Sequence, residues 1–146
     1  NSEGQIVLSG KSEDLEKLTE TLKDNSIKNI KLPVSAPFHC SLMSKAKEIM
    51  TEELNKISFS DGNNKLISNV TAETVSSNED LKSLLIKQIE NRVRWRESVL
   101  NMINSDVDHF IEIGPGKVLS GLVKRINREV KINTINSLED IENLKI

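Results

Sequence analysis

The chain has 146 residues, of which 36% are apolar and 29% charged, and its formal net charge is −2. This length fits one domain or parts of two, and the charge balance excludes a basic nucleic-acid surface. No apolar stretch is long enough for a membrane span or a signal peptide, so we expect a cytoplasmic protein. With one cysteine and two histidines far apart in sequence, we expect neither a disulfide within the chain nor a zinc cluster.

The start of the sequence predicts a strand, a helix and a second strand. Gln5–Ser9 and Ile27–Val34 are β-branched runs typical of strands. Leucines at helical spacing between them predict a helix capped by Ser12, with acidic residues in its first turn. A unit of this size cannot bury both faces of its strands, so it needs further sheet from elsewhere.

The middle of the sequence predicts three amphipathic helices. Apolar positions within residues 42–57 follow one helical face, and a polar, glycine-containing turn follows at residues 61–64. Lys65–Thr71 is a strand candidate. Two more helices are predicted after it, the first capped by Asn78 and the second starting near Trp95.

The last part predicts a strand, a tight turn, a helix and another strand. His109–Ile113 runs directly into a turn at residues 114–116, and helical periodicity restarts at Val118. The turn lacks the spacing of known phosphate-binding loops, so we favour a packing turn over a phosphate site. Val130–Ile135 is the closing strand, and Ser137 begins a capping box for a short final helix.

The loop around His39 raises the main chemical question. Pro33 and Pro37 are expected to hold the backbone extended around His39, outside any regular helix or strand. An imidazole there can accept and return a proton near neutral pH. From composition alone, a loop histidine that only hydrogen-bonds is the simpler interpretation. Motifs elsewhere in the chain favour the catalytic one.

Several segments in order resemble the C-terminal half of the malonyl-CoA:acyl-carrier-protein transacylase family, which serves bacterial-type fatty acid synthesis. They are "NSEGQIVLSG", "LPVSAPFHCSLM", "ISNVTAE", "QIENRVRWRESV" and "FIEIGPGKVLSGLVKRI". The match covers nearly the whole chain. The resemblance implies transfer of a malonyl group from malonyl-CoA to the phosphopantetheine thiol of acyl carrier protein, with no bound cofactor.

The resemblance also implies the fold. The family has a large α/β-hydrolase-like domain with a small ferredoxin-like subdomain inserted into it. Residues 1–34 would be the closing strand–helix–strand of the insert, and residues 35–146 would be the C-terminal part of the large acyltransferase domain. The chain is therefore expected to be α/β, with its first unit completed by polypeptide outside it.

The resemblance assigns four site residues. In the family a serine on a G-x-S-x-G elbow attacks the malonyl thioester, and His39 matches the histidine that acts as its base. Gln88 matches the residue whose backbone carbonyl holds the other ring nitrogen, so we expect its side chain to be replaceable. Phe38 is assigned to the substrate pocket, where its ring would favour malonyl over methylmalonyl, with packing under the loop as an equal alternative. Asn69 is expected to approach the pocket.

The sequence departs from the family by what it lacks. It contains no G-x-S-x-G, no segment for the oxyanion hole and no counterpart of the arginine that pairs with the malonyl carboxylate. We therefore expect a fragment that supplies the base but cannot transfer malonyl alone, and whose partner is the missing N-terminal half. Arg92 is a smaller departure, because relatives commonly carry proline there.

Other reactive residue types have structural interpretations. Arg92, Arg94 and Arg96 are expected to be solvated or salt-bridging surface residues. Cys40 is expected to point away from His39 as a small packing residue, and His109 to be a surface or hydrogen-bonded core residue. Two other functions stay open: an acyltransferase domain cut from a modular polyketide synthase, and a non-catalytic module that binds carrier protein.

Overall fold

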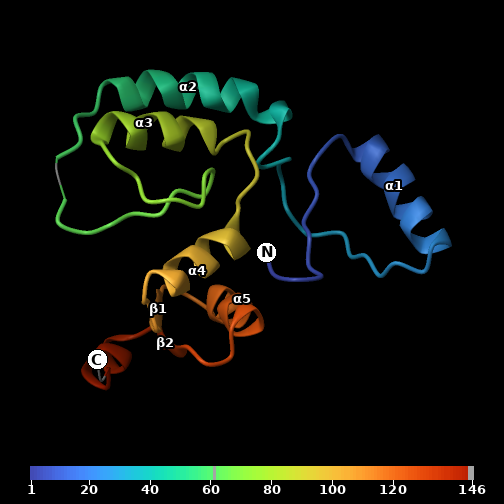
Figure 1. The fold of residues 1–146 in the computed structure, drawn as a ribbon. Coiled ribbons are helices and arrows are strands. Elements are labelled where there is room, and N and C mark those ends of the chain that lie inside the picture. Colours follow the sequence, from blue (N-terminus) through green and yellow to red (C-terminus); the bar gives the residue numbers. More distant parts are fainter. Residues whose placement is uncertain (61, 145–146) are drawn as a thin grey trace. The chain divides into compact units, whose positions relative to one another are not determined.

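The computed structural model describes residues 1–60 and 62–144, which form two compact units. One unit comprises Asn1–Ile6, Thr71–Glu73 and Arg94–Ile146, and the other Val7–Val70 and Thr74–Val93. Figure 1 shows the elements in chain order, which are α1 (Ser12–Asp24), the 3-10 helix η1 (Ser41–Met43), α2 (Ser44–Asn55), α3 (Asn78–Lys87), α4 (Trp95–Asn104), β1 (His109–Ile113), α5 (Val118–Ile126), β2 (Lys131–Ile135) and α6 (Leu138–Glu142).

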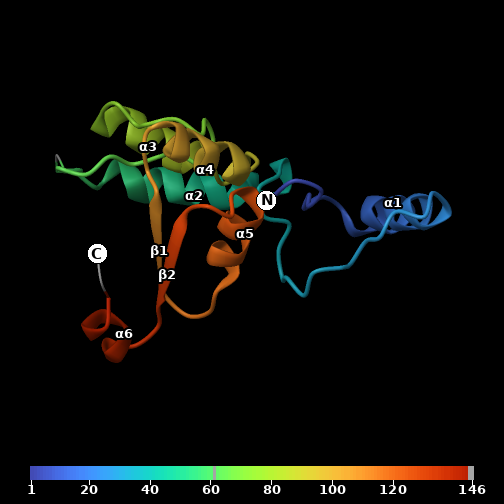
Figure 2. The same cartoon turned by 60° about the horizontal axis from the view of Figure 1, so that its bottom comes forward.

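The unit that contains the C-terminal elements is built around a small parallel sheet. Strands β1 and β2 pair in parallel, from His109 opposite Lys131 to Ile113 opposite Ile135. Helix α5 connects the two strands and packs against both, and α4 packs against α5 (Figure 2). The buried apolar side chains of these elements are Val99, Leu122, Val123 and Ile135. The strand–helix–strand order predicted for this region is confirmed.

The other unit is mainly helical. Helices α2 and α3 pack against each other (Figure 1), and α1 buries none of its side chains. The predicted helix over residues 42–57 is confirmed with one change, because its first turn is the 3-10 helix η1. In the described residues, no helix is long and apolar enough to cross a membrane.

Two predicted helix caps are wrong by one residue. Ser12 is the first residue of α1, and the cap position is Lys11, which makes no side-chain cap. Asn78 likewise begins α3, and the cap is Ser77, whose Oγ accepts the backbone N–H of Asp80 at 3.0 Å. Ser77 has the extended backbone that a cap requires, with φ −149° and ψ 166°. The capping box of Ser137 and Asp140 at α6 is confirmed.

Three predicted strands are absent from the described residues. Gln5–Ser9, Ile27–Val34 and Lys65–Thr71 form no ladder, and their pairing is limited to the isolated bridges Ser2–Gln5 and Ile67–Thr74. A strand needs a continuous ladder of hydrogen bonds to a neighbour, and these runs have single bridges at most. The apolar side chains of the first two runs stay exposed, with Ile6 81% and Ile30 75% accessible, whereas Ile67 and Val70 of the third run are half-buried. Of the turn predicted at 61–64, Asp61 lies outside the described residues, and the domain boundary at residue 34 stays a prediction.

Candidate active site

His39 lies in a turn that leads into η1. Its backbone φ is 63°, so the extended conformation predicted from the neighbouring prolines is wrong at this residue. Proline restricts itself and the residue before it, and His39 is two residues after Pro37. The left-handed region is uncommon for a residue with a side chain, although histidine adopts it more often than most. His39 is exposed.

One ring nitrogen of His39 is held by the end of α3. The Nδ1 atom lies 2.8 Å from the backbone carbonyl oxygen of Gln88, the C-cap residue of that helix. Carbonyls in the last turn of a helix lack partners within the helix and are free to accept other donors. Because a carbonyl can only accept, Nδ1 must carry the hydrogen, and in the neutral ring Nε2 is then unprotonated. Within the described part of the chain, Nε2 has no hydrogen-bond partner.

The structure also brings Asn69 to Gln88. The half-buried Asn69 donates from Nδ2 to the side-chain Oε1 of Gln88 at 3.2 Å. Gln88 therefore joins His39 through its backbone and Asn69 through its side chain. Neither spacing nor periodicity indicated this second contact, since residues 69 and 88 belong to different elements. The catalytic role of His39 and the pocket role of Asn69 stay predictions.

Phe38 is not part of this hydrogen-bonded group. Its side chain is 49% exposed, so the ring is not packed beneath the loop, and its role in a substrate pocket stays a prediction. Cys40 is half-buried and donates its thiol to the carbonyl of Pro37 at 3.2 Å. This contact within the turn accounts for Cys40 as a packing residue.

The remaining singled-out residues have structural partners. Nε2 of His109 lies 2.7 Å from Oδ1 of Asn133 on β2, so this histidine is a hydrogen-bonded, half-buried residue as expected. Arg94 pairs with Glu97 at 3.8 Å, and Arg96 pairs with Glu3 at 3.9 Å. These exposed pairs agree with a surface role for the two arginines.

The turn between β1 and α5 uses its own groups to cap the helix. The carboxylate of Glu112 accepts the backbone N–H groups of Leu119 at 3.1 Å and Ser120 at 2.7 Å. The pKa of Glu112 is lowered first by the Ser120 hydroxyl and the Ser120 backbone N–H, and further by the Leu119 N–H, while desolvation raises it. Gly116, whose φ is 97°, donates its N–H to Asn136 at 2.7 Å. These donors are already bonded within the protein, but no atom lies within 4 Å of a Cβ added at Gly114 or Gly116, so the packing role expected for this turn stays a prediction.

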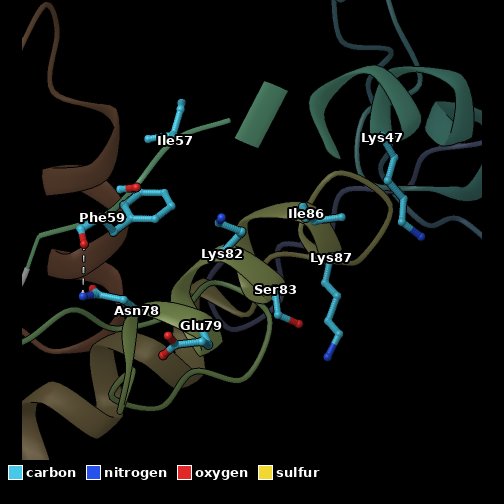
Figure 3. A pocket seen from close by; sticks show the side chains of 10 residues that line it. Lys47, Ile57, Phe59, Asn78, Glu79, Lys82, Ser83, Ile86 and Lys87 are labelled. Atoms are coloured by element: carbon cyan, nitrogen blue, oxygen red, sulfur yellow. Dashed lines mark hydrogen bonds between the residues drawn. The ribbon is translucent and has the colours of Figure 1, made fainter. Parts of the chain in front are cut away.

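A separate groove lies between α3 and the segment after α2. It has a volume of about 680 Å³ and is lined by apolar side chains such as Ile57, Phe59 and Ile86, and by lysines (Figure 3). Asn78 closes one end by donating to the carbonyl of Phe59 at 3.4 Å (Figure 3). The groove includes none of the predicted site residues, so it is not the candidate active site.

The curated proteins that resemble this chain in sequence belong to one family. No family model matches the chain. The malonyl CoA-acyl carrier protein transacylase of Bacillus subtilis is 44% identical over 143 residues, which is 97% of this chain and 45% of that protein. The chain therefore spans about half the length of the curated relatives that it matches.

Solved structures agree with this result. The malonyl CoA-acyl carrier protein transacylase from Clostridium perfringens matches with a TM-score of 0.82 at 44% identity, over 88% of this chain and 41% of that chain. A malonyl-transacylase in complex with a type II PKS acyl-carrier protein matches with a TM-score of 0.86 at 32% identity, over 92% and 44% of the two chains. Since both the sequence and the fold match over most of its length, the chain belongs to the malonyl-CoA:acyl-carrier-protein transacylase family.

Proposed function

We propose that the chain is the C-terminal half of a malonyl-CoA:acyl-carrier-protein S-malonyltransferase and that His39 is its general base. The observation that carries the proposal is the 2.8 Å contact between Nδ1 of His39 and the carbonyl of Gln88. It places the hydrogen on Nδ1 and leaves the lone pair of Nε2 exposed. A ring in this state can accept a proton from a hydroxyl brought to Nε2.

The proposed reaction has two half-reactions that use the same nitrogen. In the first, Nε2 takes the proton of a serine hydroxyl, the oxygen bonds to the malonyl carbonyl carbon, and the departing CoA thiolate takes the proton back from the imidazolium. In the second, Nε2 takes the proton of the carrier-protein thiol, the sulfur attacks the acyl ester, and the serine oxygen leaves with that proton. Neither half-reaction, as written, requires a cofactor. The products are free CoA and the malonyl thioester of the carrier protein, and the serine and histidine are regenerated.

The serine and the malonyl-binding arginine belong, in this proposal, to an N-terminal half outside the chain. The sequence contains no G-x-S-x-G, and the relatives are about twice as long. Residues 1–34 would complete a ferredoxin-like subdomain with that half, and residues 35–146 would complete the α/β-hydrolase-like domain. Phe38 would then lie in the malonyl pocket beside His39.

Acyl carrier protein is the proposed acceptor. The supporting observation is the matched complex of a malonyl-transacylase with a type II PKS acyl-carrier protein, which shares 32% identity with this chain. The same observation favours a second candidate, in which the acceptor is a polyketide carrier protein. The two candidates share their chemistry and differ in the acceptor.

The test uses a chimera in which this chain replaces the matching 143 residues of the Bacillus subtilis relative. With labelled malonyl-CoA, we expect the chimera to form an acyl-serine and to pass the label to a phosphopantetheinylated carrier protein. The 146-residue chain alone should stay unlabelled. Fatty acid and polyketide carrier proteins, offered in parallel, distinguish the two acceptors.

His39→Ala in the chimera should slow acylation by about 10²- to 10⁴-fold, the usual contribution of a general base. The matched control is His109→Gln, which keeps a side-chain amide for Asn133 and should leave the rate unchanged. An undiminished rate in the His39 variant would remove it from the mechanism. Label on the chain alone would show that it carries its own nucleophile, and binding of carrier protein without any acyl transfer would favour a non-catalytic module.

A further inference from the structure

We propose that Asn69 is a positioning residue that acts on His39 through Gln88. Its amide would hold the Gln88 side chain and so fix the backbone carbonyl that orients the imidazole. This role differs from the substrate-pocket role that the sequence predicted for Asn69. The expected effect of Asn69 on the acylation rate rests on the proposed function. Its effect on the tautomer of the His39 ring can be measured without assuming that function.

The end of α3 has backbone hydrogen bonds of uneven length: the N–H groups of Gln88 and Asn91 bond at 3.0 Å and 3.1 Å, but the two between them are longer. The N–H of Ile89 is 3.4 Å from the carbonyl of Ile86, and the N–H of Glu90 is 3.3 Å from that of Lys87. Both are long for backbone hydrogen bonds, and helix ends fray. Gln88 is the residue just before this loosened segment. Its carbonyl can hold His39 in one orientation only if the end of α3 stays in place.

Two side-chain contacts tie this segment to other elements. Lys47 on α2 donates to Glu90 at 2.6 Å, and Asn69 donates to Gln88 at 3.2 Å. The Lys47 pair is partly exposed, and such pairs contribute little on their own. The Asn69 contact is the one that reaches the residue whose carbonyl bonds His39.

Asn69 is itself well anchored. The loop that carries it is closed by the bridge between Ile67 and Thr74 and by a 2.9 Å hydrogen bond from Val75 to Leu66. At its start, the buried Ser68 accepts the N–H of Val70 at 3.1 Å. The half-buried Asn69 amide would be destabilised if it lost its hydrogen-bond partner, because it is partly shielded from water. This favours the conformation in which it bonds Gln88. The restraint therefore runs from this loop through Asn69 and Gln88 to His39.

The first test measures the tautomer of His39 in the 146-residue chain labelled with ¹⁵N-histidine. At alkaline pH, the ring-nitrogen shifts should show the hydrogen on Nδ1. Free imidazole side chains favour the Nε2–H tautomer, so loosening the carbonyl should raise that population. Asn69→Ala and Gln88→Ala should both do so, and the second variant leaves the loop around Asn69 intact.

The matched control is Asn143→Ala. Asn143 is exposed and its side-chain amide donates to the carbonyl of Glu139 at 3.0 Å, which is the same kind of contact at the end of a different helix, α6. This variant should leave the His39 tautomer unchanged. His109 provides an internal reference in each spectrum, because its contact with Asn133 lies on the sheet. An unchanged His39 tautomer in both the Asn69 and Gln88 variants would overturn the proposal.

The second test measures acylation in the chimera. Asn69→Ala and Gln88→Ala should each lower kcat by about tenfold with KM for malonyl-CoA unchanged, because a misplaced base slows only the chemical step. The double variant should be no slower than either single variant, since both break one contact. A raised KM with unchanged kcat for Asn69→Ala would assign it to the substrate pocket instead. If the tautomer shifts but the chimera is inactive, the positioning role stands and the proposed function fails.

Discussion

The buried core around α4 allows a quantitative prediction from one substitution. Val99 is fully buried, with 0% of its surface exposed, on a helix that packs against α5. Val99→Ala removes two methyl groups, which at about 0.8 kcal/mol each gives about 1.6 kcal/mol of lost burial. The cavity left behind adds to this loss, and the better helix propensity of alanine offsets part of it. We therefore expect the free energy of unfolding of this unit to fall by about 2 kcal/mol.

The assay is urea unfolding followed by tryptophan fluorescence. Trp95 is the only tryptophan in the sequence, its indole N–H is buried, and it lies one helical turn before Val99 on α4. With a urea m-value of about 1 kcal/mol/M, the midpoint should fall by about 2 M, or the unit should fail to fold. The control is Val118→Ala, because Val118 is 72% exposed at the start of α5. Equal midpoints for the two variants would refute the assignment of Val99 to the core.

Three further predictions concern the turn between β1 and α5 and the two elements that flank it, and they use the same probe. Gly116→Ala should destabilise the unit by about 1 kcal/mol or more, because its φ of 97° strains any residue with a Cβ. Gly121→Ala, within α5 and with no atom near the added methyl, should stabilise it by up to about 1 kcal/mol. Because the pKa of Glu112 is lower in the folded state, its ionised form stabilises the fold at pH values above the usual glutamate pKa. This stabilisation is lost as the pH falls through the lowered pKa of the folded state. In Glu112→Gln, the urea midpoint should therefore fall less as the pH is lowered than it does in the unsubstituted chain. The same dependence of the midpoint on pH in both proteins would contradict the prediction.

The sequence predicted the helices and the two strands that flank α5 well, and for a physical reason. Helix patterns depend on contacts within four residues, so the periodicity of residues 95–104 or 118–126 is sufficient to define α4 and α5. The predicted strands at Gln5–Ser9 and Ile27–Val34 depend on partners that the run itself does not encode. Strand β1 found its partner in β2 because both flank the same helix, as in a compact crossover.

The site could be predicted only in part. The position of the turn at residues 114–116, between a strand and a helix, followed from the sequence pattern, whereas the contact between residues 39 and 88 spans 49 positions and followed only from the resemblance. The resemblance named the backbone carbonyl of Gln88 but gave its side chain no function. Its bond to Asn69 depends on how the 66–75 loop lies against the end of α3, which no local pattern determines.

A carbonyl that orients a histidine places different demands on a fold than a carboxylate does. A carboxylate attracts the ring through its charge over several directions, whereas a neutral carbonyl holds it by one directed hydrogen bond. The orientation of His39 then depends on how firmly Gln88 is fixed, because no charge compensates for a displaced oxygen. The carbonyl also cannot titrate, so it holds the same ring nitrogen at every pH at which the protein stays folded. In our proposal, a base of this kind depends on the rigidity of a helix end, and the anchored amide of Asn69 contributes to that rigidity.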